Sequence, residues 1–181
     1  LEMKFDQNSV QDLKKDITEM EHMLEAYLAF ARGEGDENPD LIELGVLIRD
    51  VINSAQRKGA VIDLHIESLI QVSLRPQAFK RCIANLIENA DRYAEHVSVR
   101  VGLRGSMIEI IIDDDGPGIP EKLREDAFKP FYRLEQSRNP ETGGVGLGLS
   151  IARDIIRGHG GDISLRESPL GGLRVKLMVP L

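Results

Sequence analysis

The sequence feature that most constrains the fold is a pair of runs in residues 96–113, HVSVRVGLRGSMIEIIID, in which apolar and polar side chains alternate. Alternation with a period of two is typical of a strand with one buried face, and Arg104–Gly105–Ser106 between the runs is typical of a turn. The stretch therefore predicts a β-hairpin. Because the apolar face of a sheet must be covered, the rest of the chain has to supply a second layer.

Patterns elsewhere in the chain extend the sheet and supply that layer. Short alternating runs predict further strands over residues 61–67 and 69–75 and a second hairpin over 162–180. Apolar residues spaced three and four apart predict helices over residues 44–56, 76–93 and 147–158. The sequence therefore predicts an α/β fold, a two-layer α/β sandwich in which three helices cover a mixed sheet.

The first part of the chain carries a different pattern. A seam with alternating steps of three and four predicts a long bundle helix that needs a partner helix; the seam consists of Val10, Leu13, Ile17, Met20, Leu24, Tyr27 and Ala31. The stretch RGEGDENPD that follows has the composition of a linker. The partner helix belongs either to another copy of the chain or to a segment upstream of Leu1, and LEMKFDQNS is typical of the end of one helix and a loop. We therefore predict a partial helical hairpin over residues 1–36 and a second domain over residues 37–181.

The composition argues against several classes of protein. No run approaches the about 18–20 apolar residues of a membrane span, so any membrane attachment is expected outside this sequence. The net charge is −7, and the basic residues are scattered among acids, which argues against nucleic acid as a partner. The single cysteine, Cys82, falls within a predicted helix, so we expect a buried structural thiol.

A polar stripe runs along the helix predicted over residues 76–93. At about 100° per residue, one sector of this helix is polar and lies beside the apolar sector; it holds Asn85, Glu88, Asn89, Arg92 and Tyr93. Amide oxygens suit Mg²⁺, a guanidinium suits phosphate, and a phenol ring suits a base. The alternative is a solvated helix edge with an ordinary pair between Glu88 and Arg92.

Two glycine-rich stretches lie downstream. In IIIDDDGPGIP, a carboxylate at the end of a strand can accept the exocyclic amino group of adenine, but the three acids can also bind metal or solvate a turn. In GGVGLGLS, free amides at the start of a helix can bind an anion, although the stretch can instead be a hinge and matches neither the P-loop nor GxGxxG. The irregular residues 114–145 predict a mobile functional loop.

Taken in order, these stretches resemble the N, G1, F and G2 boxes of sensor histidine kinases, whose ATP-binding domain belongs to the GHKL superfamily. NLIENADRY resembles the N box, DDGPGI the G1 box, FKPFYR the F box and GGVGLGLSI the G2 box. The resemblance covers residues 40–181, and EMEHMLEAYLAFARG additionally resembles the second helix of the family's dimerisation and phosphotransfer hairpin.

This resemblance implies roles for particular residues in binding ATP and Mg²⁺. Asn89 matches the asparagine that ligates Mg²⁺, and Asn85 its partner. Arg92 stands where the family usually has a lysine that contacts phosphate, Tyr93 lies beside adenine, and Asp114 matches the aspartate that recognises adenine.

Further nucleotide contacts follow from the same boxes. Arg133 and Arg138 are candidates for phosphate contact in the lid, and Val145 replaces the threonine common in the G2 box, so that a hydroxyl contact is lost. The other candidate contacts to the nucleotide are Glu88, Gly116, Gly118, Ile119, Gly144, Gly146, Leu147, Gly148 and Leu149.

The phosphate acceptor of such a kinase is not evident in this sequence. The family's acceptor histidine is normally followed by an acid, and none of His22, His65, His96 and His159 is. We therefore predict that the acceptor lies upstream of Leu1, that this chain contains no catalytic acceptor, and that it binds ATP and Mg²⁺ without phosphorylating itself. Related ATP-hydrolysing enzymes have a glutamate near position 85, and Asn85 here favours transfer over hydrolysis.

The resemblance also implies partners and a location. It indicates a homodimeric protein-histidine kinase that passes phosphate to the receiver domain of a response regulator, with this part in the cytoplasm of a bacterium. The alternatives are another GHKL ATPase or serine kinase, and a docking module without catalysis.

Overall fold

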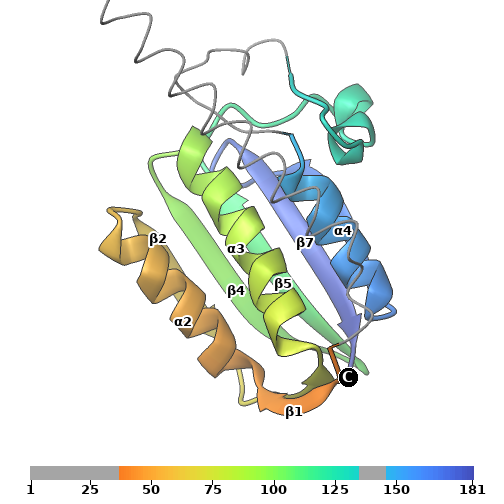
Figure 1. Cartoon of the computed structure of the whole chain (residues 1–181). Helices are drawn as coiled ribbons and strands as arrows, with labels where there is room; N and C mark the ends of the chain where they lie inside the picture. The colour runs from red at the N-terminus through yellow and green to blue at the C-terminus, as the bar shows by residue number, and fades with distance from the viewer. Residues whose placement is uncertain (1–36, 135–145) are drawn as a thin grey trace, which may run out of the picture.

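The computed structural model describes residues 37–134 and 146–181, so the predicted bundle helix lies outside the described residues. In the described part, one five-stranded sheet has helices packed on one of its faces (Figure 1). The strands follow the order β2-β4-β5-β7-β6, and they are β2 (Ile62–Ile66), β4 (Val97–Arg104), β5 (Met107–Asp114), β7 (Leu173–Pro180) and β6 (Asp162–Glu167). β2 runs parallel to β4 and the other neighbours are antiparallel, which confirms a mixed sheet.

Both predicted hairpins are confirmed. Arg104 lies opposite Met107 at the end of the β4–β5 pair, and Glu167 lies opposite Leu173 at the end of the β6–β7 pair. The strands alternate as the sequence predicts: in β5, Ile108, Ile110 and Ile112 are buried and share one face of the strand. Ile110 points toward the helices.

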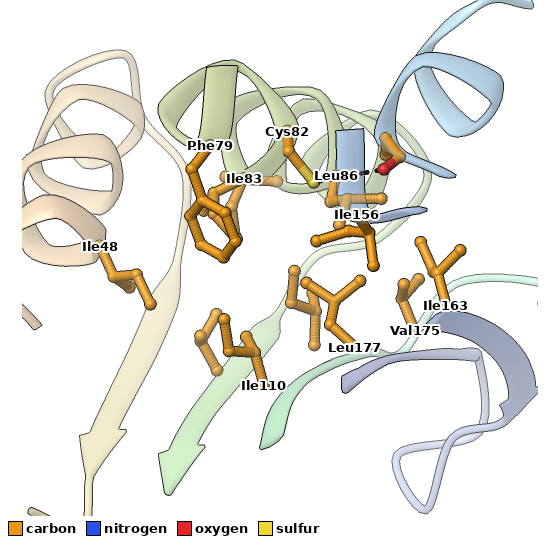
Figure 2. Packing of buried hydrophobic residues seen from close by; sticks show 14 of the residues in the cluster. Ile48, Phe79, Cys82, Ile83, Leu86, Ile110, Ile156, Ile163, Val175 and Leu177 are labelled. Carbon is orange, nitrogen blue, oxygen red and sulfur yellow. Dashed lines mark hydrogen bonds between the residues drawn. The ribbon is translucent and has the colours of Figure 1, made fainter. Parts of the chain in front are cut away.

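Three helices cover that face: α2 (Leu44–Arg57), α3 (Pro76–Tyr93) and α4 (Gly148–Gly158). Figure 2 shows Phe79, Ile83 and Leu86 of α3 packed over the sheet. Cys82 is fully buried, as predicted, and its Sγ lies 3.7 Å from the carbonyl oxygen of Ala152 in α4. None of the helices in the described ranges is long and apolar enough to cross a membrane.

A small second sheet was not predicted. β1 (Asp40–Glu43) pairs with β3 (Gln71–Leu74), and Leu41 lies opposite Ser73. The sequence predicts a linker that ends at Asp40 and no strand directly after it, because four residues are too few to show a periodic pattern. β3 itself was predicted, but it joins β1 rather than the large sheet.

Charged side chains cover the other face of the sheet, on which none of the described helices packs. Glu109 and Asp113 of β5 are almost fully buried there. Arg104 Nε lies 3.0 Å and Lys176 Nζ 2.5 Å from the Glu109 carboxylate, and these two cations hold the pKa of Glu109 below its usual range, Lys176 with the larger effect. The open face is therefore shielded by a layer of ion pairs, with the long Arg and Lys stems lying on the strands.

The N-terminus of α3 is capped from a distant part of the chain. Its N-cap residue, Arg75, makes no side-chain capping hydrogen bond. Instead the two carboxylate oxygens of Glu37 accept hydrogen bonds from Gln77 N, at 2.7 Å, and from Ala78 N, at 3.0 Å. A carboxylate at this end satisfies backbone donors and complements the helix dipole. The segment that enters β1 is thereby attached to the start of α3.

This cap predicts a stability effect at a position outside the regular elements. Replacing Glu37 with Ala should lower the free energy of unfolding of the chain by about 1 kcal/mol, since two amides of α3 lose their acceptor. Glu37→Gln should cost less, because one carbonyl acceptor is kept. Urea denaturation followed by circular dichroism measures both, with Asp50→Ala on the exposed side of α2 as control. Equal stability of Glu37→Ala and the unaltered chain would contradict the cap.

Candidate functional site

The predicted site residues that the structure describes lie at one edge of the helical layer, where four segments meet. These are the second half of α3, the end of β5 with the loop after it, residues 128–132, and the start of α4. The close approaches are between backbones: Gly148 of α4 lies against Asn85 of α3, with an ideal Cβ on Gly148 3.8 Å from Asn85 O, and Phe131 N donates to Gly146 O at 2.9 Å. Residues far apart in the sequence are thus brought together.

The polar groups of the α3 stripe make no hydrogen bond or ion pair with the described residues. Asn85 and Asn89 are half-buried, and their amide groups make no hydrogen bond to the described residues. Glu88 and Arg92 are exposed and do not form the ion pair that the alternative interpretation requires. Tyr93 is half-buried at the end of the helix. The stripe therefore presents two amides beside a cation and a ring to whatever occupies this edge.

The three consecutive aspartates have three different environments. Asp113 points to the open face, where Arg174 binds both of its carboxylate oxygens at 2.7 and 2.8 Å. Asp115 is exposed, and its Oδ1 accepts hydrogen bonds from Glu95 N and His96 N just after α3. Asp114 points to the helical side and is 5% exposed. Since no group of three His, Cys, Asp or Glu side chains in the described ranges could hold a metal ion, a metal site at these aspartates is not supported.

Asp114 is held by one of its two oxygens. Oδ1 accepts hydrogen bonds from Gly116 N at 3.0 Å and from Leu173 N at 2.9 Å. No described residue donates to Oδ2. Burial raises the pKa of Asp114, and the amides of Leu173 and Gly116 offset part of this effect. A fixed carboxylate with one open oxygen in a poorly solvated wall is suited to accept a hydrogen bond from an N–H group of a ligand.

Gly172, which the sequence does not mark as a site residue, packs closely against Asp114. A Cβ on Gly172 would lie 2.2 Å from Asp114 Oδ1 and 2.5 Å from Gly116 N, so no other residue fits without a shift. Its own N–H donates to Asp114 O at 3.1 Å. The signal available in the sequence was the pair Gly171–Gly172 in the second hairpin, which indicated only a turn.

The start of α4 completes the site. Gly146 has a φ of 75°, a conformation that favours glycine. The N-cap residue Leu147 makes no side-chain capping bond to the first amides of α4. Free amides at the start of a helix can bind an anion, and the anion site stays a prediction. Leu147 is buried, whereas Gly148 and Leu149 are half-buried.

The remaining predicted residues are placed as follows. Gly116, Gly118 and Ile119 form the loop after β5, and Arg124 Nε donates to Ile119 O at 3.0 Å. Arg133 is half-buried near the end of the first described range. Arg138, Gly144 and Val145 lie outside the described residues.

The described histidines have structural or solvent-exposed positions. His65 is exposed on β2. His96 Nε2 lies 3.2 Å from Asp63 Oδ2. His159 Nε2 accepts a hydrogen bond from Arg75 N at 3.1 Å, while its Nδ1 lies 2.7 Å from Ile155 O, so this ring joins the end of α4 to the start of α3. His22 lies outside the described residues.

Comparison with known proteins gives matches in sequence and in fold. The model of the histidine kinase-, DNA gyrase B-, and HSP90-like ATPase family matches residues 75–181. Sensor histidine kinase GtrS of Pseudomonas aeruginosa is 33% identical over 181 residues, covering 99% of this chain and 37% of GtrS. Sensor protein RstB of Escherichia coli is 35% identical over 182 residues, covering 94% of this chain and 41% of RstB.

A solved structure shows the same architecture. The ATP binding domain of PrrB from Mycobacterium tuberculosis has a TM-score of 0.65 with 26% identity, covering 80% of this chain and 98% of that domain. The predicted α/β fold with helices over a mixed sheet is thereby confirmed. The chain spans about two fifths of the length of the two curated relatives.

The neighbouring acids predict opposite dependences of stability on pH. Because its pKa is raised in the folded state, Asp114 contributes stability that is present below about pH 4 and is lost as the pH rises through the raised pKa. The pKa of Asp115 is lowered, chiefly by the His96 amide, so its contribution is present above about pH 4 and is lost in acid. Asp114→Asn should therefore gain stability relative to the unaltered chain as the pH rises, and Asp115→Asn should lose it.

Urea denaturation between pH 3 and pH 8 measures both differences. Asn keeps an oxygen acceptor at each position, so the two variants are matched controls for one another. If the stability differences of both variants changed with pH in the same direction, burial would not be the main influence on the pKa of Asp114.

Proposed function

The chain belongs to the histidine kinase-, DNA gyrase B-, and HSP90-like ATPase family, and from this premise we propose that it is the ATP-binding catalytic part of a two-component sensor histidine kinase. In this proposal residues 37–181 form the catalytic ATP-binding domain, and residues 1–36 belong to the dimerisation and phosphotransfer hairpin. The observation that carries it is the buried residue Asp114, whose Oδ2 has no donor among the described residues and which lies at the end of β5 beside the end of α3.

The adenine end of the nucleotide is assigned to Asp114. Its Oδ2 would accept the exocyclic amino group, while Oδ1 stays bonded to Gly116 and Leu173. Guanine presents a carbonyl oxygen at the corresponding position, which would face the carboxylate with no hydrogen between them. Tyr93 would lie beside the base. These contacts favour adenine over guanine.

The phosphates are assigned to the other end of the site. Arg92 is exposed and has no acidic partner among the described residues, and the start of α4 offers backbone amides. Both are positive features suited to phosphate oxygens. The ATP would therefore lie along the second half of α3, with its base at Asp114 and its phosphates toward α4.

The donor set fits Mg²⁺ bound mostly by phosphate and water. Asn89 would supply an amide oxygen and Asn85 would support it, whereas the described residues contain no carboxylate cluster that could hold the ion alone. When bound, Mg²⁺ neutralises charge on the phosphate oxygens. The protein contributes position: α3 is fixed by its buried face, so both amides have a fixed direction.

The site favours phosphoryl transfer over hydrolysis. An amide at position 85 cannot accept a proton from water as a carboxylate does, so α3 offers no general base at this position. The acceptor would be a histidine on a helix that residues 1–181 do not contain, since none of the four histidines here precedes an acid. The phosphate would pass from that histidine to an aspartate in a response-regulator receiver domain.

The assembled kinase is proposed to be a homodimer with this part in the bacterial cytoplasm. The seam predicted in residues 10–31 would pack in the dimer's helical bundle. Any membrane attachment would come from segments outside residues 1–181.

The adenine assignment predicts base selectivity. Calorimetry with Mg²⁺ should show tighter binding of ATP than of GTP. Asp114→Asn should weaken ATP binding about ten- to a hundredfold, because a charged hydrogen bond of about 1.5–3 kcal/mol is replaced by two facing donors. Asp115→Asn is the matched control and should bind ATP like the unaltered chain. Equal affinity for ATP and GTP would count against Asp114 as the residue that reads the base.

The metal assignment predicts a loss of transfer without loss of fold. A longer protein that includes the upstream helix should incorporate acid-labile phosphate from γ-labelled ATP, and residues 1–181 alone should not. Asn89→Ala in the longer protein should abolish incorporation with the melting temperature kept, because a ligand is lost and no apolar cavity is made. Asn53→Ala on the exposed side of α2 is the control. Acid-labile label on residues 1–181 alone would return His22 to consideration.

A further inference from the structure

Arg153 of α4 connects this helix to the short 3₁₀ helix η3 (Asp126–Phe128) and to the residue before it. Its guanidinium carbon lies 4.5 Å from the centroid of the Phe128 ring, over the face of the ring. Its Nη1 lies 2.7 Å from Glu125 Oε1, and its Nη2 donates to Phe128 O at 3.4 Å. The side chain is 17% exposed. We call Arg153, Glu125 and Phe128 the α4 clamp.

The ring contact is the stronger part of the clamp. The Glu125 side chain is 83% exposed, and an ion pair with so exposed an acid contributes little to stability. Phe128 is 3% exposed, so the guanidinium lies on a buried ring, where a cation–π contact is strengthened. A planar guanidinium can stack on the ring and donate to Phe128 O together, which an ammonium cannot.

The clamp acts on the segment that contacts Gly146, a predicted nucleotide contact directly before α4. From Phe128 the chain reaches Phe131 in three residues, and there Phe131 N donates to Gly146 O directly before α4. Residues 125–132 are therefore attached to α4 at two places, through Arg153 and through Gly146. α4 in turn lies against Asn85. Residues 125–132 are thus connected to Asn85 of α3 through α4.

We propose that Arg153 is a positioning residue for ATP: it touches none of the assigned nucleotide contacts and fixes residues 125–132 through Phe128. This inference rests on the proposed function. Without the Arg153 contact, the segment would be held by the hydrogen bond between Phe131 and Gly146 and by the burial of Ala127 and Phe128, and it would more often sample positions that do not bind nucleotide. The result is weaker binding with unchanged contacts.

The test uses the full chain of residues 1–181 and four variants. Arg153→Gln should weaken binding of ATP with Mg²⁺ about five- to tenfold and raise hydrogen exchange within residues 125–132. Arg153→Lys, which keeps the charge, should restore part of both. Glu125→Gln should stay within about twofold of the unaltered chain, as expected for an exposed pair. Arg157→Gln, on an exposed residue of the last turn of α4, is the matched control.

A double substitution separates positioning from general stability. If Arg153 acts through the ring, Arg153→Gln should cost no further affinity in a Phe128→Leu background, which keeps an apolar side chain in the core. If Arg153→Gln lowered ATP affinity equally with and without Phe128→Leu, the proposal would be overturned. A rise in hydrogen exchange that extends over α3 and the sheet would also overturn it. Unaltered ATP affinity in Arg153→Gln would also overturn it.

Hydrogen exchange measured without nucleotide, together with ATP binding, distinguishes a failure of the proposed function from a failure of the positioning role of Arg153. If the unaltered chain binds no ATP, the proposed function fails and the nucleotide role of Arg153 fails with it. If the unaltered chain binds ATP and exchange in residues 125–132 is the same in Arg153→Gln, only the positioning role is overturned.

Discussion

Burial of the apolar face of α3 against the sheet is the constraint on which the other features depend. Phe79, Ile83 and Leu86 are at most 1% exposed, and they fix the rotation of the helix about its axis. A rotation by one residue, about 100°, would bring polar side chains into the core and apolar ones into water. The directions of Asn85 and Asn89 therefore follow from core packing, and the site needs no separate device to orient them.

The direction in which a side chain points also gives three identical side chains at the end of β5 three different environments. Successive residues of a strand point to opposite sides, so Asp113 joins the ion pairs of the open face while Asp114 enters the wall beneath the helices. Asp115 follows the end of the strand and accepts hydrogen bonds from two backbone amides in the turn after α3. One step along the chain thus changes a carboxylate from a structural partner of arginine into a buried group with an open oxygen.

The sequence predicted what is periodic or local, and it missed what joins distant segments. The hairpins, the three helices and the polar stripe follow from spacing, and the glycine-rich boxes with Asp114 from a resemblance. β1 is too short to show a period, and the Glu37 cap joins residues about 40 positions apart with no shared motif. Gly172 and Arg153 also act on segments far away in the sequence, so that only the folded arrangement shows what they contact.

The charged layer on the open face of the sheet has a consequence for association between molecules. An uncovered sheet that was apolar on this side would stack on a second copy and aggregate. Here a stacked partner would have to strip water from Glu109, Asp113 and the cations bound to them without offering new partners for those charges. The ion pairs on the open face therefore also disfavour stacking of this sheet on the sheet of a second molecule.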